Sequence, residues 1–204
     1  MIKNIIFDYG DIFINLDKTA TARELHKLGI NDFTPEMIVK NQAYEKGLIS
    51  TDAFVHFYHE LFPKTSKNEL IDAWNAILLD FPRHRLEFIQ KLANNKNYRL
   101  FLLSNTNDLH ISWIQQDWGI ELYEEFKKNF EQFYLSHEIQ LRKPDTEIYE
   151  FVLSKNDLKA TETLFIDDTQ ENTDAAKTLG IHVWNLNPEK EDIVDLFTHK
   201  KVLF

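Results

Sequence analysis

Short runs of consecutive apolar residues recur along the chain and predict the strands of a buried sheet. Continuous apolarity, rather than alternation of apolar and polar positions, is typical of strands covered on both faces, as in a parallel sheet. The runs that we expect to form strands are residues 3–8, 99–104, 163–168 and 181–184, with a weaker fifth at 133–136. The pattern therefore predicts a parallel sheet of four or five strands.

Stretches with helical periodicity lie between the later strands. Their apolar residues recur at intervals of three and four positions, which places them on one face of a helix. The expected helices are residues 107–118, 122–130, 146–155 and 172–179. Strands that alternate with amphipathic helices indicate an α/β protein with a doubly wound parallel sheet.

The interval between the first two strands is too long for a single crossover helix and predicts an insertion. One amphipathic stripe runs from Phe54 to Phe62, and a second follows Ser66 and Glu69, which have the spacing of a capping box. Two earlier helices are expected near residues 18–28 and 35–46, and Pro82 precedes a further helix that we expect to begin at Leu86 and return to the core.

The four expected helices that precede Pro82 are expected to form a small bundle inserted into the sheet domain. The predicted division assigns residues 1–14 and 84–204 to an α/β core domain and residues 15–83 to a helical cap domain. The aromatic stripes of the inserted helices are interpreted as the core of that bundle.

Composition narrows the range of partners. The 204 residues carry a formal net charge of −10, which leaves no basic surface for nucleic acid or for an anionic membrane. The absence of cysteine excludes disulfides, thiol catalysis and thiolate metal sites. No apolar run approaches the length of a membrane span, and an apolar strand begins almost directly after Met1, so a cytoplasmic protein is expected.

Side chains suited to phosphate chemistry stand where the predicted strands end or a helix begins. In a doubly wound sheet the carboxyl ends of the strands form the ligand-binding edge. We expect these side chains to meet there: Asp8, Ser104, Asn105, Lys143, Asp167 and Asp168.

Each of these residues has a possible role in phosphoryl transfer. A carboxylate at Asp8 could attack phosphorus, and the adjacent acids Asp167 and Asp168 would repel each other unless a cation such as Mg²⁺ neutralised them. The Ser104 hydroxyl and nearby backbone amides could hold phosphate oxygens, and Lys143 could offset charge. Taken singly, each motif is also typical of an ordinary turn or helix start, so their order and common position favour a site for a small phosphorylated substrate.

The same motifs, in this order, resemble those of the haloacid dehalogenase (HAD) superfamily, whose members are mostly phosphatases. The resemblance covers essentially the whole chain, including a helical cap inserted after the first motif. It implies a Rossmann-like core and Mg²⁺ as the cofactor. It also implies that Asp8 is the nucleophile that forms an aspartyl-phosphate, with Ser104 and Lys143 binding the phosphate, while the amides at Asn105 are expected to bind it because of their place near a helix start.

The resemblance further implies a set of metal ligands. Mg²⁺ would be held by Asp8, Asp168 and the backbone carbonyl of Gly10, with Asp167 supporting these ligands from behind. One position departs from the family's fullest pattern, because Gly10 stands where many members have a second Asp that acts as general acid and base. Asp11 is a poor substitute, since strand alternation would point its side chain away from Asp8.

The departure at Gly10 leaves several functions open. The preferred one is a phosphatase of the sugar-phosphate branch, similar to alpha-glucose-1-phosphate phosphatases, because an anomeric phosphate has a good leaving group and needs less acid catalysis. An alternative is a weakly active or inactive protein that binds phosphate. A phosphomutase or a 2-haloacid dehalogenase is less favoured. The cap is expected to contact substrate near residues 15–17 and 44–47.

Overall fold

The computed structural model describes all residues from Met1 to Phe204 and is centred on a five-stranded parallel sheet. Its strands are β1 (Asn4–Phe7), β2 (Arg99–Ser104), β3 (Gln132–Leu135), β4 (Thr163–Asp167) and β5 (His182–Asn185). Their order in the sheet is β3-β2-β1-β4-β5, so the winding direction reverses at β1. The predicted doubly wound sheet is confirmed, with all five expected strands present.

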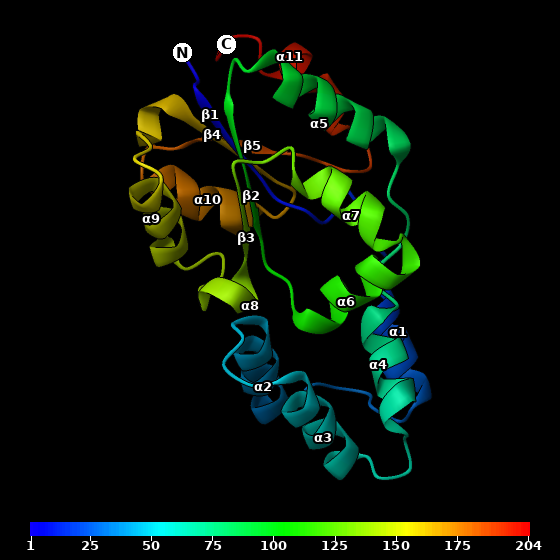
Figure 1. The fold of residues 1–204 in the computed structure, drawn as a ribbon. Helices are drawn as coiled ribbons and strands as arrows, with labels where there is room; N and C mark the ends of the chain where they lie inside the picture. Colours follow the sequence, from blue (N-terminus) through cyan, green and yellow to red (C-terminus); the bar gives the residue numbers. More distant parts are fainter.

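Helices cover both faces of the sheet (Figure 1). On one face lie α5 (Arg83–Asn95) and α7 (Ile120–Lys127), and on the other lie α9 (Thr146–Lys155) and α10 (Gln170–Thr178). The remaining core helices are α6 (Asp108–Asp117), α8 (Ser136–Ile139), α11 (Leu196–His199) and the 3-10 turns η1 (Ala160–Glu162) and η2 (Ile193–Asp195). No helix of the chain has both the length and the apolarity needed to cross a membrane.

The central strand β1 shows why its sequence is apolar without interruption. Ile5 and Phe7 belong to the larger hydrophobic cluster, which includes residues of α5 and α7. Ile6, which points to the other face, belongs to a second cluster with residues of α9 and α10. Because both faces are covered, each position of the strand is buried, as the pattern of a parallel sheet requires.

Four helices lie between β1 and α5 and stand apart from the sheet in Figure 1. They are α1 (Ala20–Lys27), α2 (Pro35–Glu45), α3 (Thr51–Leu61) and α4 (Lys67–Asn75). Their aromatic stripes pack together, with the rings of Tyr44 and Phe54 stacked at a centroid distance of 4.1 Å. The capping box predicted at the start of α4 is present, because Ser66 and Glu69 each accept a hydrogen bond from the backbone N–H of the other.

Three helix predictions differ from the structure. The helix expected at residues 122–130 is α7 and spans Ile120–Lys127, so both of its ends lie earlier in the chain. The helix expected to begin at Leu86 begins at Arg83, since Pro82 takes the extended backbone conformation of an N-cap and the helix starts at the next residue. The single-turn helix α8 was not expected, because four residues are too few to show helical periodicity.

The two segments that join the helical insertion to the core run side by side. The backbone N–H of Asn15 donates to the carbonyl of Asp80 (2.9 Å), and the N–H of Leu79 donates back to the carbonyl of Asn15 (3.1 Å). Arg85, which is buried, holds this pair to the core by donating to Asn15 Oδ1 and to Asp192 Oδ2, each over 3.1 Å. The insertion is therefore joined to the core through a paired two-segment linker.

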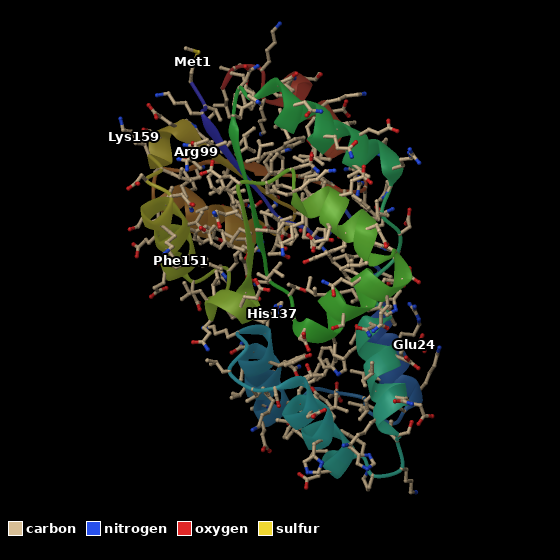
Figure 2. The ribbon with its side chains drawn as sticks, viewed as in Figure 1. Met1, Glu24, Arg99, His137, Phe151 and Lys159 are labelled. Carbon is tan, nitrogen blue, oxygen red and sulfur yellow. The ribbon has the colours of Figure 1, made fainter.

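The C-terminal end of α2 makes a second contact with the core. Gly47 adopts a φ of +65°, and a Cβ at this position would overlap the carbonyl oxygen of His137, which lies where the core meets the insertion (Figure 2). Only glycine permits so close an approach of the two backbones. Next to it, Lys46 Nζ lies 2.9 Å from Asp145 Oδ2, so ionic contact adds to the close packing.

Candidate active site

An acidic cluster lies at the carboxyl edge of the sheet, at the ends of the adjacent strands β1 and β4. The register pairs Phe7 with Ile166, which brings Asp8 level with Asp167. Oxygen atoms from the carboxylates of Asp8, Asp167 and Asp168 all lie within 4.8 Å of one another. The structure thus brings together the three acids that the sequence placed at strand ends.

Lys143 joins this cluster from the loop between α8 and α9. Its Nζ lies 2.7 Å from Asp8 Oδ1 and 2.6 Å from Asp167 Oδ2, and its side chain is almost fully buried. The Asn105 side chain positions the loop, because its amide donates to the carbonyl of Lys143 and its oxygen accepts from the N–H of Lys143, each over 2.8 Å. Asn105 therefore acts on the site by fixing the backbone from which Lys143 projects.

Burial and charge alter the acid strengths in the cluster. Burial raises the pKa of Asp8 to about 7, although the neighbouring Lys143 ammonium acts in the opposite direction. Burial also raises the pKa of Asp168. For Lys143, burial alone would lower the pKa, but the carboxylates of Asp167 and Asp8 outweigh it and hold the pKa above its ordinary value.

The charges of the cluster suit a divalent cation. The buried Lys143 ammonium contacts only Asp8 and Asp167, and the third carboxylate, Asp168, pairs with the half-exposed Lys18, so the three acids together exceed the buried positive charge. Carboxylate and carbonyl oxygens are the ligands that Mg²⁺ prefers, and one or two carboxylates are typical of its sites. Burial, and to a smaller extent repulsion from Asp167, raises the pKa of Asp8, and the positive charge of a bound Mg²⁺ would oppose both effects, so the residues present fit this ion.

Asp167 differs from Asp8 and Asp168 in the number of hydrogen bonds that its carboxylate accepts. In addition to Lys143, it accepts hydrogen bonds from the N–H of Thr169 (2.8 Å) and from Nδ2 of Asn172 (3.0 and 3.1 Å). With these donors in place it is better suited to orient the site than to bind a metal directly. This contact of Asn172 was not predicted, because a polar residue in the first turn of a helix carries no signal of its own.

The predicted phosphate-binding residue Ser104 lies at the end of β2, next to β1. It is buried and lines a cavity of about 170 Å³ together with Gly10 and Asn105. Its hydroxyl makes only one long contact, of 3.5 Å, with the Asn105 carbonyl. The hydroxyl therefore remains available to a ligand, whereas any phosphate contact from Asn105 would come from its backbone N–H.

Asp11 does not take the place of the acid missing at Gly10. Its Oδ1 accepts a hydrogen bond from the N–H of Leu16 (3.0 Å), and its Oδ2 lies 3.1 Å from Lys18 Nζ. Lys18 also contacts Asp168, so it bridges the linker and the acidic cluster. This role of Lys18 was not predicted, because it depends on where the linker packs.

Comparisons with known proteins agree with this geometry. The haloacid dehalogenase-like hydrolase family matches residues 5–186. D-ribitol-5-phosphate phosphatase of Bacteroides thetaiotaomicron is 28% identical over 190 residues, covering 90% of this chain and 91% of the relative. A sesquiterpene phosphatase of Aspergillus oryzae is 44% identical over 191 residues, covering 88% and 87%.

A solved structure resembles the whole fold. A HAD family enzyme from Bacteroides thetaiotaomicron, crystallised with magnesium and inorganic phosphate, is 32% identical with a TM-score of 0.79, covering 97% of this chain and 100% of that one. The family match spans the sheet, the helical insertion and all the strand-end acids described above. The chain therefore belongs to the haloacid dehalogenase-like hydrolase family.

Proposed function

We propose that this protein is a Mg²⁺-dependent phosphatase that hydrolyses a small phosphorylated metabolite through an aspartyl-phosphate on Asp8. The observation that carries the proposal is the convergence of the Asp8 and Asp168 carboxylates with the buried Lys143 ammonium at one sheet edge. The magnesium and phosphate held by a structural relative of the same fold support it.

The proposed reaction has two steps. The Asp8 carboxylate attacks phosphorus while the substrate's alkoxide departs and takes a proton from solvent, and water then hydrolyses the acyl-phosphate to release inorganic phosphate. Lys143 stabilises charge on the transferring group and holds the Asp8 carboxylate in place. Ser104 donates its hydroxyl to a phosphate oxygen.

The proposed ligands of Mg²⁺ are Asp8, Asp168 and the backbone carbonyl of Gly10, with Asp167 orienting them through its own hydrogen bonds. When bound, Mg²⁺ would supply electrostatic stabilisation to the phosphoryl oxygens. Because Gly10 carries no side chain, the leaving group receives no proton from the position two residues after the nucleophile. This favours substrates whose leaving group departs readily.

The preferred substrates are sugar phosphates, first among them anomeric phosphates, whose leaving group departs readily. A relative of similar length is a D-ribitol-5-phosphate phosphatase, which supports a polyhydroxylated organic part. We also propose that residues 15–83 form a cap that closes over the site and that residues 1–14 and 84–204 form the core. The paired linker and the separate hydrophobic cluster of the insertion support this division.

A second candidate function follows from Gly10. Without the usual acid, the protein could bind Mg²⁺ and phosphate esters yet hydrolyse them negligibly. Retention of Asp8, Ser104, Lys143 and Asp168 favours the phosphatase, because binding alone does not require a nucleophile.

The experiment is a panel of phosphate esters assayed with Mg²⁺ and again with EDTA. The panel contains glucose 1-phosphate, D-ribitol 5-phosphate and para-nitrophenyl phosphate. We expect Mg²⁺-dependent release of phosphate that falls by about 10⁴-fold or more in Asp8→Asn, as for loss of a nucleophile elsewhere. Hydrolysis at the wild-type rate in Asp8→Asn would rule out the aspartyl-phosphate, and binding without hydrolysis would support the second candidate.

A further inference from the structure

Two cavities meet where the helical insertion faces the core. The first, which we call the site cavity, has a volume of about 170 Å³ and is lined by Gly10, Ser104 and Asn105 among others. The second, the cap cavity, has a volume of about 390 Å³ and aromatic walls that include Tyr44, Phe54 and Trp74. The residues common to both linings, which we call the neck, are Glu45, Ile77, Asn107 and His110.

Most polar atoms of the neck are already engaged within the protein. Asn107 Oδ1 accepts from the N–H of His110 (3.0 Å), and its amide lies 3.3 Å from His110 Nδ1. The other ring nitrogen of His110 lies 3.1 Å from the carbonyl of Trp74. Ile77 offers no polar side-chain atom. Asn107 keeps one amide N–H as a donor, whereas the charged acceptor that faces a ligand in the neck is Glu45.

Glu45 stands at the C-terminal end of α2 and reaches across to the core. Its Oε2 accepts from Nε of Arg142 over 2.7 Å, and its Oε1 makes no hydrogen bond within the protein. Arg142 immediately precedes Lys143, so the loop that carries the buried lysine also holds this carboxylate. The arginine offsets the charge of Glu45, which lowers its repulsion toward a phosphate ester entering the site cavity.

We propose that Glu45 selects phosphate esters whose organic part carries a hydroxyl close to the ester oxygen. The inference rests on the proposed function and adds a specificity residue to it. An ionised carboxylate can only accept hydrogen bonds, so it matches a hydroxyl donor at the neck. An apolar chain in the same place would exclude water from the Glu45 carboxylate and offer it no hydrogen bond in return. A carboxylate left without hydrogen bonds costs free energy, so the site would discriminate strongly against such a ligand.

The cap cavity accommodates the remainder of such a substrate. Aromatic faces pack against the carbon chain of a sugar or sugar alcohol, while the carboxylate at the neck reads its hydroxyl. The relatives show why the distinction matters, because one is a D-ribitol-5-phosphate phosphatase and another a sesquiterpene phosphatase. Glu45 assigns this chain to the hydroxylated class.

The experiment compares D-ribitol 5-phosphate with n-pentyl phosphate, which has the same number of carbons and no hydroxyl groups. The ratio of their kcat/KM values is measured with Mg²⁺ for the wild type and for Glu45→Ala. We expect the substitution to reduce this ratio by about 10- to 100-fold, the range for a hydrogen bond to a charged group, mainly through loss of activity on the ribitol ester. Glu45→Gln, which keeps an acceptor oxygen, should restore part of the ratio.

Lys46→Ala is the matched control. Lys46 is the next residue along the chain and forms an ion pair with Asp145 across the same boundary, yet it lines neither cavity. We expect it to leave the ratio unchanged. If Glu45→Ala lowered kcat/KM equally for both esters, Glu45 would serve only to hold the helical insertion against the core, and its role in substrate selection would be wrong.

Measurements of binding affinity test the role of Glu45 independently of the proposed phosphatase activity. Calorimetry with Asp8→Asn measures the affinity for both esters without turnover, with and without Glu45→Ala added. We expect the second substitution to weaken binding of D-ribitol 5-phosphate selectively. Absence of hydrolysis by the wild type would overturn the proposed function, whereas an unchanged affinity ratio, or no binding of the ribitol ester, would overturn the role of Glu45.

Discussion

The ammonium of Lys143 lies 2.7 Å from Oδ1 of Asp8, and its side chain is almost completely withdrawn from solvent. Asp167 contacts the same ammonium from 2.6 Å, so two carboxylates share one cation. A buried arrangement of this kind depends on each partner, because removal of one leaves an uncompensated charge. Stability of the sheet edge and chemistry of the site are therefore linked through Lys143.

Replacing this cation should destabilise the protein strongly. We expect Lys143→Met to lower the free energy of unfolding by about 3–5 kcal/mol, because Asp8 and Asp167 would remain buried without a counter-charge. Urea denaturation measures the change. Lys18→Met is the matched control, since Lys18 is half exposed and its ion pairs should contribute about 1 kcal/mol or less. If the two variants had the same free energy of unfolding, the buried ammonium of Lys143 would not stabilise the protein more than the half-exposed one of Lys18.

Restoring the missing acid should accelerate hydrolysis of poor leaving groups. Gly10 does not adopt a left-handed conformation, and a Cβ there would meet only the side chain of Leu16, most closely its Cδ1 at 2.6 Å, which is the far end of a flexible side chain. We expect Gly10→Asp to fold and to raise kcat for unactivated alkyl phosphates, with about 10²–10⁴-fold as the range for general acid catalysis.

Gly10→Ala is the control for this substitution, because it adds the same Cβ without a carboxylate. We expect Gly10→Ala to show no gain in kcat for alkyl phosphates. A gain of the same size in both variants would mean that the shift of Leu16, and not an added acid, is responsible.

Mg²⁺ should stabilise the folded protein as well as support its activity. A ligand that binds only the folded state adds about 2.7 kcal/mol when present at 100 times its dissociation constant. We expect a rise in melting temperature on adding MgCl₂, no comparable rise with NaCl at equal ionic strength, and reversal by EDTA.

The same thermal measurement tests the proposed ligand Asp168. We expect Asp168→Asn to reduce the Mg²⁺-induced shift in melting temperature, because a neutral amide is a weaker ligand than a carboxylate. Asp174→Asn, an exposed acid of the nearby helix α10 that pairs with Gln170, should leave the shift intact. Equal shifts in both variants would remove Asp168 from the metal site.

Acid should weaken the protein through His110. Burial lowers its pKa to about 4, although the Trp74 carbonyl acts in the opposite direction. In the unfolded chain the imidazole titrates near 6.5, so between these values the unfolded state binds more protons. The contribution of His110 to the free energy of unfolding is thus fully present above pH 6.5 and is lost as the pH falls through 4.

Urea denaturation at about pH 7.5 and about pH 5 checks this dependence. We expect the wild type to lose more stability between the two values than His110→Gln, in which position 110 does not titrate. Parallel losses in the two proteins would show that His110 is not held neutral by the fold.

Much of the fold followed from local pattern. The five strands were predicted because burial on both faces requires continuous apolar runs, and the start of α4 because Ser66 and Glu69 form a capping box through contacts only three residues apart. The start of α5 and the existence of α8 were not predicted, since one depends on the conformation of Pro82 and the other on a single turn without periodicity.

The acids Asp8, Asp167 and Asp168 were determined by the sequence itself, because a parallel strand necessarily delivers the residue at its end to one edge of the sheet. Only the tertiary structure decided that Asn105 holds Lys143, that Lys18 bridges Asp11 and Asp168, and that Glu45 stands at the neck. These contacts join residues that are far apart in the chain, and their distances depend on strand register and on how the helical insertion docks on the core.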